Sequence, residues 1–581
     1  MFYKEESSHI QEQVAKHLRT LLLEGETCGT LFSNFKCLHS LTLTSECYTK
    51  FPDSIRELIH LRYLNISSTR IENLPEWIGE LHHLQTLRTN RFIVSDRLPS
   101  SIKYLINLRH LYLRSGKEIG KLTSLQTLQK FEVGTEKGYK IEELESLNNL
   151  KGTLKIKHLE RVCDKEEAMK ANVLLKSNIS NLALKWDEDS DNERNDKSVL
   201  EGLQPHANLK ILKIKGFKGK TFPTWCKKMA VWDGSQCSWV PLDNLIEITL
   251  MGCLECEEIP MLEHLPNLKT LFLVDLKKLN FINSPSFKNL KTLIIYNLEG
   301  LQCLPELLFY NNQSLSNLWI VKCHVLSELP YGLDTLDSLK ELILEDCPNL
   351  KAIGNLSHGA KKYQGILREL KIVGCRELVQ FPCQILESSA PTIEVLILKG
   401  LRSLKNLPML IDCFVKSYPC LKDLTIKGVP NIMTIKCSSS RWLKELEIDA
   451  SVKWCRETSL SIIETVDRIL QGCCNSFTHL YLKGVENWDW LPQSIQHLTT
   501  LDTLELENIG VEELPQWLGN QSSLRKLCLL GCYRLRCLPS VAAFKRLTEL
   551  DLLQITDCPE LHIDSEWHTL PNLKISDGSM T

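Results

Sequence analysis

The sequence lacks a long apolar run, a secretory signal and an excess of charge of either sign. No part of its 581 residues approaches the roughly 20 consecutive apolar residues of a membrane span, and the opening MFYKEESSHIQEQVAKHL has no apolar signal core. The 69 Lys and Arg nearly balance the 71 Asp and Glu, so no overall field draws the chain to nucleic acid or anionic lipid. We therefore predict a cytoplasmic protein, with the nucleus as a second compartment open to it, that binds other proteins through local surfaces.

Motifs of catalysis and of cofactor binding are also missing. The sequence contains no HExxH and no GxSxG. The triplet GKT at 219–221 resembles the end of a phosphate loop, but Ile214 stands where that loop requires its first glycine, and Phe222-Pro223 follow instead of a helix. We therefore predict a non-enzymatic chain with no catalytic residues and no cofactor.

An acidic run at 187–197 is the strongest candidate for a cation site. Asp187, Asp189 and Asp191 have the spacing that opens a calcium loop. Such a loop then requires a glycine and a bidentate glutamate, and the chain supplies Asn192 and Ser198 at those positions. The run therefore predicts a solvated loop, and we predict no metal site.

The dominant positive feature is the pattern Leu-x-x-Leu-x-Leu, which returns about every 23 residues. Each unit reads as one short strand, a turn and a return segment, and no unit can bury its own leucines. We predict an α/β fold: a leucine-rich repeat solenoid, or horseshoe, of about 20 coils with a parallel β-sheet on its concave face. The pattern begins at Leu18, Leu38, Leu61, Leu84, Leu108, Ile179, Leu209, Leu245, Leu268, Leu290, Leu315, Leu339, Leu367, Ile393, Leu421, Leu443, Phe477, Leu501, Leu524 and Leu547.

The regularity of the pattern divides the chain into four segments. Residues 1–17 precede the repeats, and residues 18–134 form short, regular coils. Residues 135–205 are irregular and contain the acidic loop 187–197, and residues 206–581 resume the repeats with variable length. Insertions of that kind are expected in loops, where added length costs little.

Cysteine is abundant, with 23 residues, and several cysteines share one repeat position three residues after a strand. A small buried side chain fits that turn, so we predict a reduced structural ladder that faces backbone groups of adjacent coils. The alternative is zinc, because Cys253 and Cys256 form a CxxC with Cys226 and Cys237 upstream. The ladder positions are Cys253, Cys323, Cys347, Cys375, Cys532 and Cys558.

Four longer segments carry a family resemblance: IGKLTSLQTLQKFEVG (119–134), LNNLKGTLKIKHLERVCDKEEAMKANV (147–173), VLEGLQPHANLKILKIKGFKGKTFPTWC (199–226) and LEHLPNLKTLFL (262–273). They resemble the leucine-rich repeat region of plant intracellular immune receptors of the coiled-coil, nucleotide-binding type. The resemblance implies that the chain senses a pathogen effector or a modified host protein and contributes to autoinhibition. The nucleotide-binding module of such receptors has no counterpart here, which suggests a fragment, a truncated product or a stand-alone repeat protein.

The main alternative is a stand-alone intracellular scaffold of repeats without a nucleotide switch. An extracellular receptor ectodomain would require a signal peptide and coils of the form LxGxIP, whereas this chain has LPxxIGxL.

The residues between the core leucines are expected to project from the concave sheet. With strands about 4.8 Å apart, Phe272, Ile294, Trp319 and Ile343 would form an apolar ladder, with Tyr296 beside it. An exposed aromatic ladder suits a protein partner, although β-branched and aromatic residues also favour strands for their own sake. These five residues are the predicted partner-binding site.

A second predicted surface is basic. Residues 61–130 contain 11 Lys or Arg against 5 Asp or Glu, a net charge of +6. The resemblance implies that Arg62, Arg88, Arg109 and Arg114 contact an acidic face of the nucleotide-binding module of the same or a paired receptor. Nucleic acid and a merely solvated edge are the competing interpretations. A third predicted surface is acidic and comprises Glu445, Glu447, Asp449, Glu505, Glu507, Glu549 and Asp551.

Overall fold

The structure of the protein is a computed structural model. It describes residues 17–24, 31–90, 99–112, 118–187, 195–234, 237–282, 287, 289–354, 366–380, 383–389, 391–404, 423–427, 434–439, 444–449, 467, 470, 478–484, 490–562 and 574–577. The chain divides into two compact units, Met1–Asn289 and Leu290–Thr581. Across the described ranges, no helix is both long enough and apolar enough to cross a membrane.

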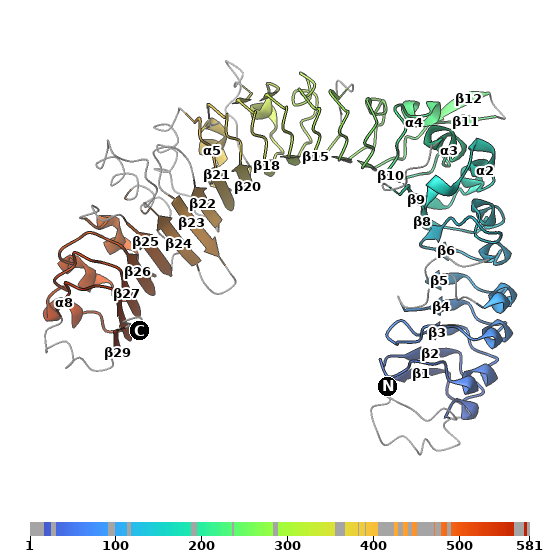
Figure 1. Ribbon diagram of the computed structural model, residues 1–581, viewed down its shortest axis with the longest axis horizontal. Helices are drawn as coiled ribbons and strands as arrows, with labels where there is room; N and C mark the ends of the chain where they lie inside the picture. The colour runs from blue at the N-terminus through green and yellow to red at the C-terminus, as the bar shows by residue number, and fades with distance from the viewer. Residues whose placement is uncertain are drawn as a thin grey trace. The chain divides into compact units, whose positions relative to one another are not determined.

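Each unit is a stack of coils, most of which contribute one strand to a sheet, and this confirms the predicted leucine-rich repeat solenoid (Figure 1). In the first unit, six parallel strands pair in chain order, and a second parallel series follows. The first series is β1 (Thr20–Leu23), β2 (Ser40–Leu43), β3 (Tyr63–Asn65), β4 (Thr86–Arg88), β5 (His110–Tyr112) and β6 (Thr127–Leu128). The second is β7 (Phe131–Glu132), β8 (Gly152–Lys157), β9 (Ile179–Lys185), β10 (Ile211–Lys215), β13 (Glu247–Met251) and β14 (Thr270–Val274).

Short helices, mostly 3-10 helices (η), form the return segments of the first unit and lie on the side of the coils away from the strands (Figure 1). A hairpin of β11 (Ala230–Asp233) and β12 (Ser238–Pro241) interrupts the repeats after the last of these helices. The helices are η2 (Leu31–Asn34), η3 (Asp53–Glu57), η4 (Glu76–Glu80), η6 (Ser100–Tyr104), η7 (Ile119–Lys121), η8 (Ile141–Leu144), η9 (Leu159–Arg161), α2 (Lys165–Met169), η10 (Val173–Leu175), α3 (Asp196–Gly202) and α4 (Thr224–Lys228).

The second unit repeats this arrangement with one departure from a wholly parallel sheet. Its strands are β15 (Thr292–Tyr296), β16 (Asn317–Val321), β18 (Glu341–Glu345), β20 (Glu369–Val373), β21 (Val395–Lys399), β22 (Asp423–Lys427), β23 (Thr434–Ser439), β24 (Lys444–Asp449), β25 (His479–Lys483), β26 (Thr503–Glu507), β27 (Lys526–Leu530), β28 (Leu552–Thr556) and β29 (Lys574–Asp577). Strand β23 runs antiparallel to both neighbours, β22 and β24. The repeat pattern did not predict this strand, because it carries no leucine triplet.

The remaining elements of the second unit are short. A two-stranded parallel pair consists of β17 (Glu328–Leu329) and β19 (Ala352–Ile353). The helices are η11 (Leu333–Thr335), α5 (Cys383–Ser389), η13 (Gln493–His497), η14 (Gln516–Asn520) and α8 (Val541–Phe544).

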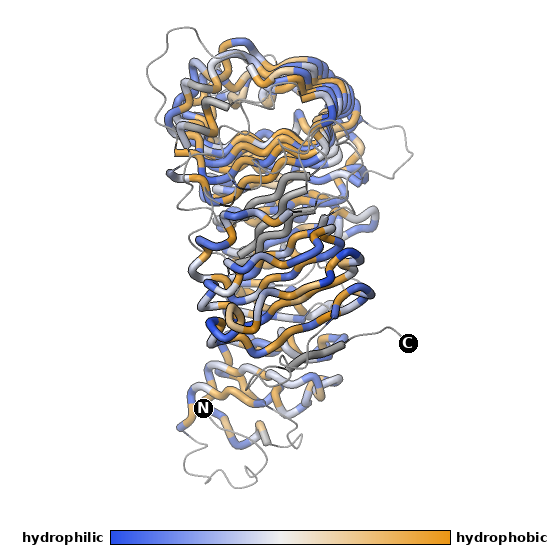
Figure 2. The backbone as a smooth tube through the Cα atoms, turned by 90° about the vertical axis from the view of Figure 1, so that its left-hand side faces the viewer, coloured by the Kyte–Doolittle hydropathy of each residue, from blue (hydrophilic) through white to orange (hydrophobic). Residues whose placement is uncertain are grey.

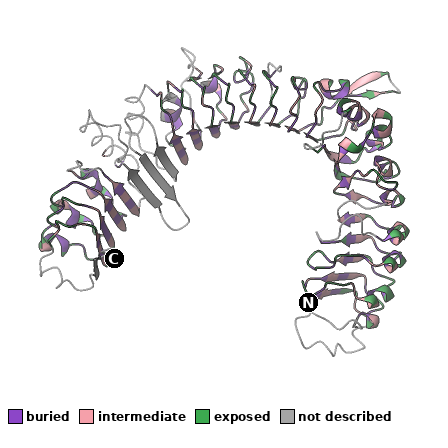
Figure 3. Ribbon diagram, viewed as in Figure 1, coloured by how far each residue is buried: buried purple, intermediate pink, exposed green. Residues whose placement is uncertain are grey.

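Alternation of burial along each strand explains why the sequence stacks in this way. In β16, Leu318 and Ile320 are fully buried, whereas Asn317, Trp319 and Val321 face the other side of the sheet and are partly exposed. Successive strands place buried residues at matching positions, and hydrophobic residues recur at the same place in successive coils (Figures 2 and 3). The core therefore runs through each unit as a continuous column that only neighbouring coils can complete.

The predicted start of one repeat, at Leu547, is wrong by three residues. The segment LTELDLLQI contains two overlapping matches to the pattern, one beginning at Leu547 and one beginning at Leu550. The structure uses the second, because Leu553 and Ile555 are the buried residues of β28. Pairing of β27 with β28 in this register buries both side chains against the preceding coil.

The cysteine ladder lies as predicted. Cys253, Cys323, Cys347, Cys375 and Cys532 are buried free thiols, and Cys558 is partly buried. Each thiol lies near the carbonyl two residues earlier, and most also face a strand carbonyl of the preceding coil. For example, Cys347 Sγ is 3.5 Å from Glu345 O and 3.7 Å from Ile320 O.

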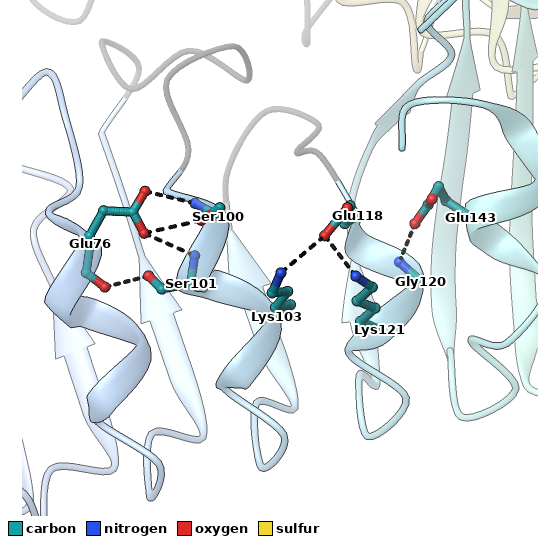
Figure 4. Close-up of polar contacts among 8 residues, drawn as sticks. All are labelled: Glu76, Ser100, Ser101, Lys103, Glu118, Gly120, Lys121 and Glu143. Atoms are coloured by element: carbon teal, nitrogen blue, oxygen red, sulfur yellow. Dashed lines mark hydrogen bonds and ion pairs between the residues drawn. The ribbon is translucent and has the colours of Figure 1, made fainter. Parts of the chain in front are cut away.

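Carboxylates and hydroxyls join the return segments of the first unit from coil to coil (Figure 4). Glu76 in η4 accepts hydrogen bonds from the amides of Ser100 and Ser101, at 3.0 and 3.1 Å, where η6 begins. Burial alone would raise the pKa of Glu76, but these hydrogen bonds outweigh it and lower the pKa. Glu143 in η8 accepts from the Gly120 amide at 2.9 Å in the same way. These contacts satisfy helix amides that have no partner within their own short helix.

Candidate protein-recognition surface

Three predicted binding residues of the second unit lie in one row across its sheet, which we call the apolar row: Ile294, Trp319 and Ile343. In the parallel register, Ile294 of β15 lies opposite Trp319 of β16, and Trp319 lies opposite Ile343 of β18. The next residue of the row is Lys371 of β20, whose ammonium pairs with Glu345 at 2.8 Å. The apolar row is thus three strands wide and ends at a charged pair.

Polar and charged groups contact two aromatic side chains, one at the centre of the apolar row and one beside it. The indole Nε1 of Trp319 donates a hydrogen bond to Glu341 Oε2 at 3.2 Å, which fixes the ring across two strands. Tyr296 lies at the end of β15, and the ammonium of Lys322 is 5.3 Å from its ring centroid, within the range of a cation–π contact. A fixed indole and a fixed phenol ring suit recognition, because less side-chain entropy is lost when a partner binds.

One expectation about the ladder, the exposure of Ile343, needs correction. Ile343 is only 8% exposed, so it supports the apolar row from below instead of offering contact area. It lies between Trp319 and Lys371 in the register. Phe272 occupies the corresponding position of β14 in the first unit, opposite Thr249 of β13. The apolar row is therefore defined within the second unit alone.

The basic residues of the first unit lie on and beside the sheet β1–β6. Arg88 is an exposed residue of β4, and its guanidinium carbon is 4.9 Å from the Tyr112 ring centroid of β5. Arg62 and Arg109 are exposed and directly precede β3 and β5. Within the described part of the chain, no carboxylate lies within ion-pair distance of these three arginines. Arg114 lies outside the described residues. Arg62, Arg88 and Arg109 are called the basic surface below.

Further basic residues lie in the same inter-coil row as Arg62 and Arg109, although the sequence pattern did not predict them as part of a surface. Backbone hydrogen bonds run from His39 N to Arg19 O and from Arg62 N to His39 O, so Arg19 and His39 precede Arg62 in one inter-coil row. The row continues to Lys151, whose amide donates to Gln126 O. Burial and the charges of Arg62 and Arg19 lower the pKa of His39, so the imidazole adds little positive charge at neutral pH. The signal that could have found these residues is their shared position just before each strand.

The predicted acidic surface is largely neutralised by its neighbours. Glu505 of β26 lies 3.5 Å from His479 Nε2 and 3.6 Å from Lys526 Nζ, and Glu507 pairs with Lys483 at 2.6 Å. Glu549 and Asp551 precede β28 and do not lie on the sheet, because the strand begins three residues later than predicted. The side chains of Glu445, Glu447 and Asp449 lie outside what the structure describes.

The zinc alternative gains no support. Among the described residues, the Sγ atoms of Cys226, Cys253 and Cys256 do not all lie within 4.8 Å of one another. Cys256 Sγ is instead 3.1 Å from Gly219 O, and burial raises the pKa of Cys226, which disfavours the thiolate that zinc requires.

Comparison with known proteins finds partial similarity to one repeat family and to several plant disease resistance proteins. Residues 141–276 match the family of R13L1/DRL21 leucine-rich repeats. The chain is 29% identical over 397 residues to RGA1 of Solanum bulbocastanum, an alignment that covers 65% of this chain and 38% of that protein. Disease resistance protein RGA2 of the same species is 28% identical over 422 residues, covering 69% of this chain and 40% of its own length. The RPP13-like protein 1 of Arabidopsis thaliana is 30% identical over 368 residues, covering 57% and 33%. The chain thus spans about 40% or less of the length of these relatives.

Two solved structures are distant matches. The plant peptide hormone receptor RGFR1, solved in complex with RGF2, is 18% identical, with 97% of each chain covered and a TM-score of 0.38. The Toll–Spatzle complex of Drosophila is 14% identical, with 92% of this chain and 63% of that chain covered and a TM-score of 0.45. The chain's own repeat geometry and its curated relatives identify it as a leucine-rich repeat solenoid similar in sequence to plant disease resistance proteins.

Proposed function

We propose that the chain is the recognition region of a plant intracellular immune receptor, acting in the cytoplasm and without enzymatic activity. In this proposal, the sheet face of the second unit binds a pathogen effector or a host protein that an effector has modified. The observation that carries the proposal is Trp319, a fixed and partly exposed indole at the centre of the apolar row. The similarity to disease resistance proteins supports the biological setting.

Replacement of Trp319 and Ile294 together by serine is expected to weaken binding of the recognised protein about thirtyfold. Truncation of an aromatic anchor at the centre of an interface typically costs about 2 kcal/mol or more. The measurement is a titration of the full chain and the variant with each protein that scores positive in a screen of secreted pathogen proteins.

The matched control is Tyr331→Ser. Tyr331 is 57% exposed and lies between β17 and η11, outside the apolar row. Loss of binding in both variants would indicate a general loss of structure, and unchanged binding in the double variant would contradict the proposed surface.

We further propose that the basic surface contacts an acidic face of a nucleotide-binding module, either of the same receptor or of a paired one. Three exposed arginines without a carboxylate partner in the described part of the chain support an acidic partner. Binding of the recognised protein would release this contact only to the extent that it binds the released state more tightly.

Charge reversal of Arg62, Arg88 and Arg109 to glutamate is expected to weaken binding of a purified nucleotide-binding module about tenfold or more. The loss should be largest at low salt, because exposed charges are screened within about 10 Å at 0.1 M salt. Fluorescence anisotropy over a series of salt concentrations measures the loss of affinity and its dependence on salt. The control reverses three exposed arginines of the second unit, Arg525, Arg534 and Arg536. Binding of a DNA duplex in place of the module, with the same salt dependence, would favour nucleic acid and refute this part of the proposal.

A further inference from the structure

We propose that the first unit contains a zinc site formed by His158, Glu160 and Asp187. Among the described residues, these three are the one group whose potential ligand atoms all lie within 4.8 Å of one another. None of the three belongs to the apolar row or to the basic surface, and the site does not depend on the proposed function.

The fold brings the three residues together at the carboxyl ends of two neighbouring parallel strands. His158 directly follows β8, and Asp187 follows β9 by two residues. The two strands pair in register to their last residues, Lys157 opposite Lys185, so the turns that leave them lie side by side. Ligands in sheets of this kind commonly bind beyond the carboxyl ends of the strands, where loop side chains converge.

Glu160 is the fixed centre of the group. Its side chain is only 8% exposed, and both carboxylate oxygens are held. Oε1 lies 3.0 Å from His158 Nδ1, and Oε2 accepts a hydrogen bond from the Asp187 amide at 2.8 Å. The carboxylate therefore joins the two turns, and the exposed carboxylate of Asp187 lies above it.

The distances suit a metal of the size of zinc. Ligand atoms about 2.0–2.1 Å from a tetrahedral zinc ion are about 3.3 Å apart, so the 3.0 Å between His158 Nδ1 and Glu160 Oε1 would widen slightly when the ion binds. One imidazole and two carboxylates are ligands that zinc accepts, and a water molecule would complete a tetrahedral set. His158 also adopts a left-handed backbone, with φ of 58°, which directs its ring back toward Glu160.

Charge near the group sets its expected affinity. Two carboxylates favour a dication, whereas the Arg161 Nε lies 3.9 Å from Glu160 Oε1 and opposes it. Arg161 is tied to the preceding coil through its Nη1, which donates to Val133 O at 2.9 Å, so its charge stays near the site. Removal of this charge is therefore expected to tighten metal binding.

The test is a titration of the reduced full chain with Co²⁺, followed by displacement with Zn²⁺. A site of nitrogen and oxygen ligands gives cobalt d–d bands without thiolate charge-transfer absorption, which distinguishes it from the many cysteines of the chain. We expect one cobalt ion per chain with such a spectrum. His158→Asn and Asp187→Asn should each weaken binding about tenfold or more, and Arg161→Gln should tighten it several-fold.

Two further variants serve as controls. Asparagine tolerates the left-handed backbone, so His158→Asn removes the imidazole without straining the turn, and circular dichroism checks the fold. His264→Asn alters an exposed histidine elsewhere in the unit and should leave binding unchanged. Cys163 is an exposed free thiol five residues after His158. Absence of saturable binding, equal affinity in His158→Asn, or a thiolate spectrum that disappears in Cys163→Ser would each overturn the proposal.

A second readout does not depend on the cobalt spectrum. Zinc should slow amide hydrogen exchange in peptides that cover residues 158–162 and 184–187, because the ion would crosslink the two turns. Peptides from the second unit should not change. Slower exchange in both units would indicate nonspecific binding to thiols and would contradict the site.

Discussion

Replacement of Gly79 by alanine is expected to destabilise the neighbouring coils of the first unit by about 3 kcal/mol, because an added methyl group overpacks a contact that cannot yield. A Cβ at Gly79 would lie 2.4 Å from Ser101 O and 2.7 Å from Ser101 Cβ. The first of these atoms is backbone, so relief requires that η4 and η6 move apart. Their separation would also stretch the hydrogen bonds from Ser100 and Ser101 to Glu76.

The need for glycine here is steric and not conformational, since Gly79 does not have a positive φ. Gly519 occupies the same repeat position in η14, and a Cβ there would lie 2.3 Å from Ala543 O. Gly519→Ala should therefore produce a loss of similar size in the second unit. Lys103 holds the equivalent position of η6, so Lys103→Ala is the matched control and should change stability by less than about 0.5 kcal/mol.

Native-state hydrogen exchange measures these effects coil by coil, which suits a stack of repeats that need not unfold in one step. Faster exchange in Gly79→Ala should be confined to peptides around η4, η6 and the strands beside them. Equal exchange in Gly79→Ala and the Lys103→Ala control would show that the return segments separate at little cost, contrary to the prediction.

Replacement of Lys176 by glutamine is expected to remove a pH dependence of stability worth about 3 kcal/mol. Lys176 is fully buried, and its ammonium donates to Leu144 O at 2.8 Å and Leu147 O at 3.2 Å in the preceding coil. Burial lowers the pKa of Lys176 from 10.5 to about 8. A displacement of that size corresponds to about 3 kcal/mol between the charged and neutral forms.

The direction of this pH dependence follows from the pKa of Lys176 in the unfolded chain, 10.5, and in the folded chain, about 8. Above pH 10.5 the lysine is neutral in both the folded and the unfolded chain, and burial carries no charge penalty. As the pH falls from 10.5 to about 8, the unfolded chain takes up the proton first, so the folded state loses stability. Below about pH 8 the loss is complete and constant. The wild-type chain should therefore gain stability relative to Lys176→Gln as the pH rises through this window.

Glutamine is the appropriate replacement because the chain uses it at the same repeat position. Gln521 is buried in the second unit, and its Nε2 donates to Ile495 O at 2.6 Å, as Lys176 does to Leu144 O. The measurement is urea unfolding at about pH 7 and pH 10.5, in which the difference between wild type and variant cancels all other titrating groups. Lys137→Met, at an exposed lysine, is the control. A wild-type-to-variant difference that stays constant with pH would refute the prediction.

The sequence predicted most of what depends on a single coil. Alternation within NLWIV placed Leu318 and Ile320 in the core and left Trp319 on the open face, and the structure agrees. The shared position of the ladder cysteines predicted thiols that face backbone carbonyls, and Cys347 does so. Both features are local, because the strand period and the turn after it are set by neighbouring residues.

Features that depend on pairing between coils were missed or misplaced. The segment after Leu547 satisfies the repeat in two phases, and only pairing with β27 selects the phase that buries Leu553 and Ile555. The sequence predicted that Glu505 and Glu507 belong to an acidic surface. In the structure, basic residues of the adjacent strands pair with both carboxylates.

The proposed zinc ligands also depend on pairing between coils. Asp187 has the spacing of the start of a calcium loop, but the residues that follow it do not complete that loop, and the sequence pattern predicts no metal site. His158 and Glu160 are far from Asp187 in the sequence and share no motif with it, and only the pairing of β8 with β9 brings the three together.

The sequence alone determined that the chain is a stack of leucine-rich coils and which residues of each strand are buried, because hydrophobic periodicity acts within one repeat. The tertiary structure decided which side chains of neighbouring coils meet: Trp319 with Glu341, Gly79 with Ser101, and Lys176 with Leu144. Those contacts depend on the register between strands and on the close approach of return segments. The spacing of the leucines predicts neither the register between strands nor the distance between return segments.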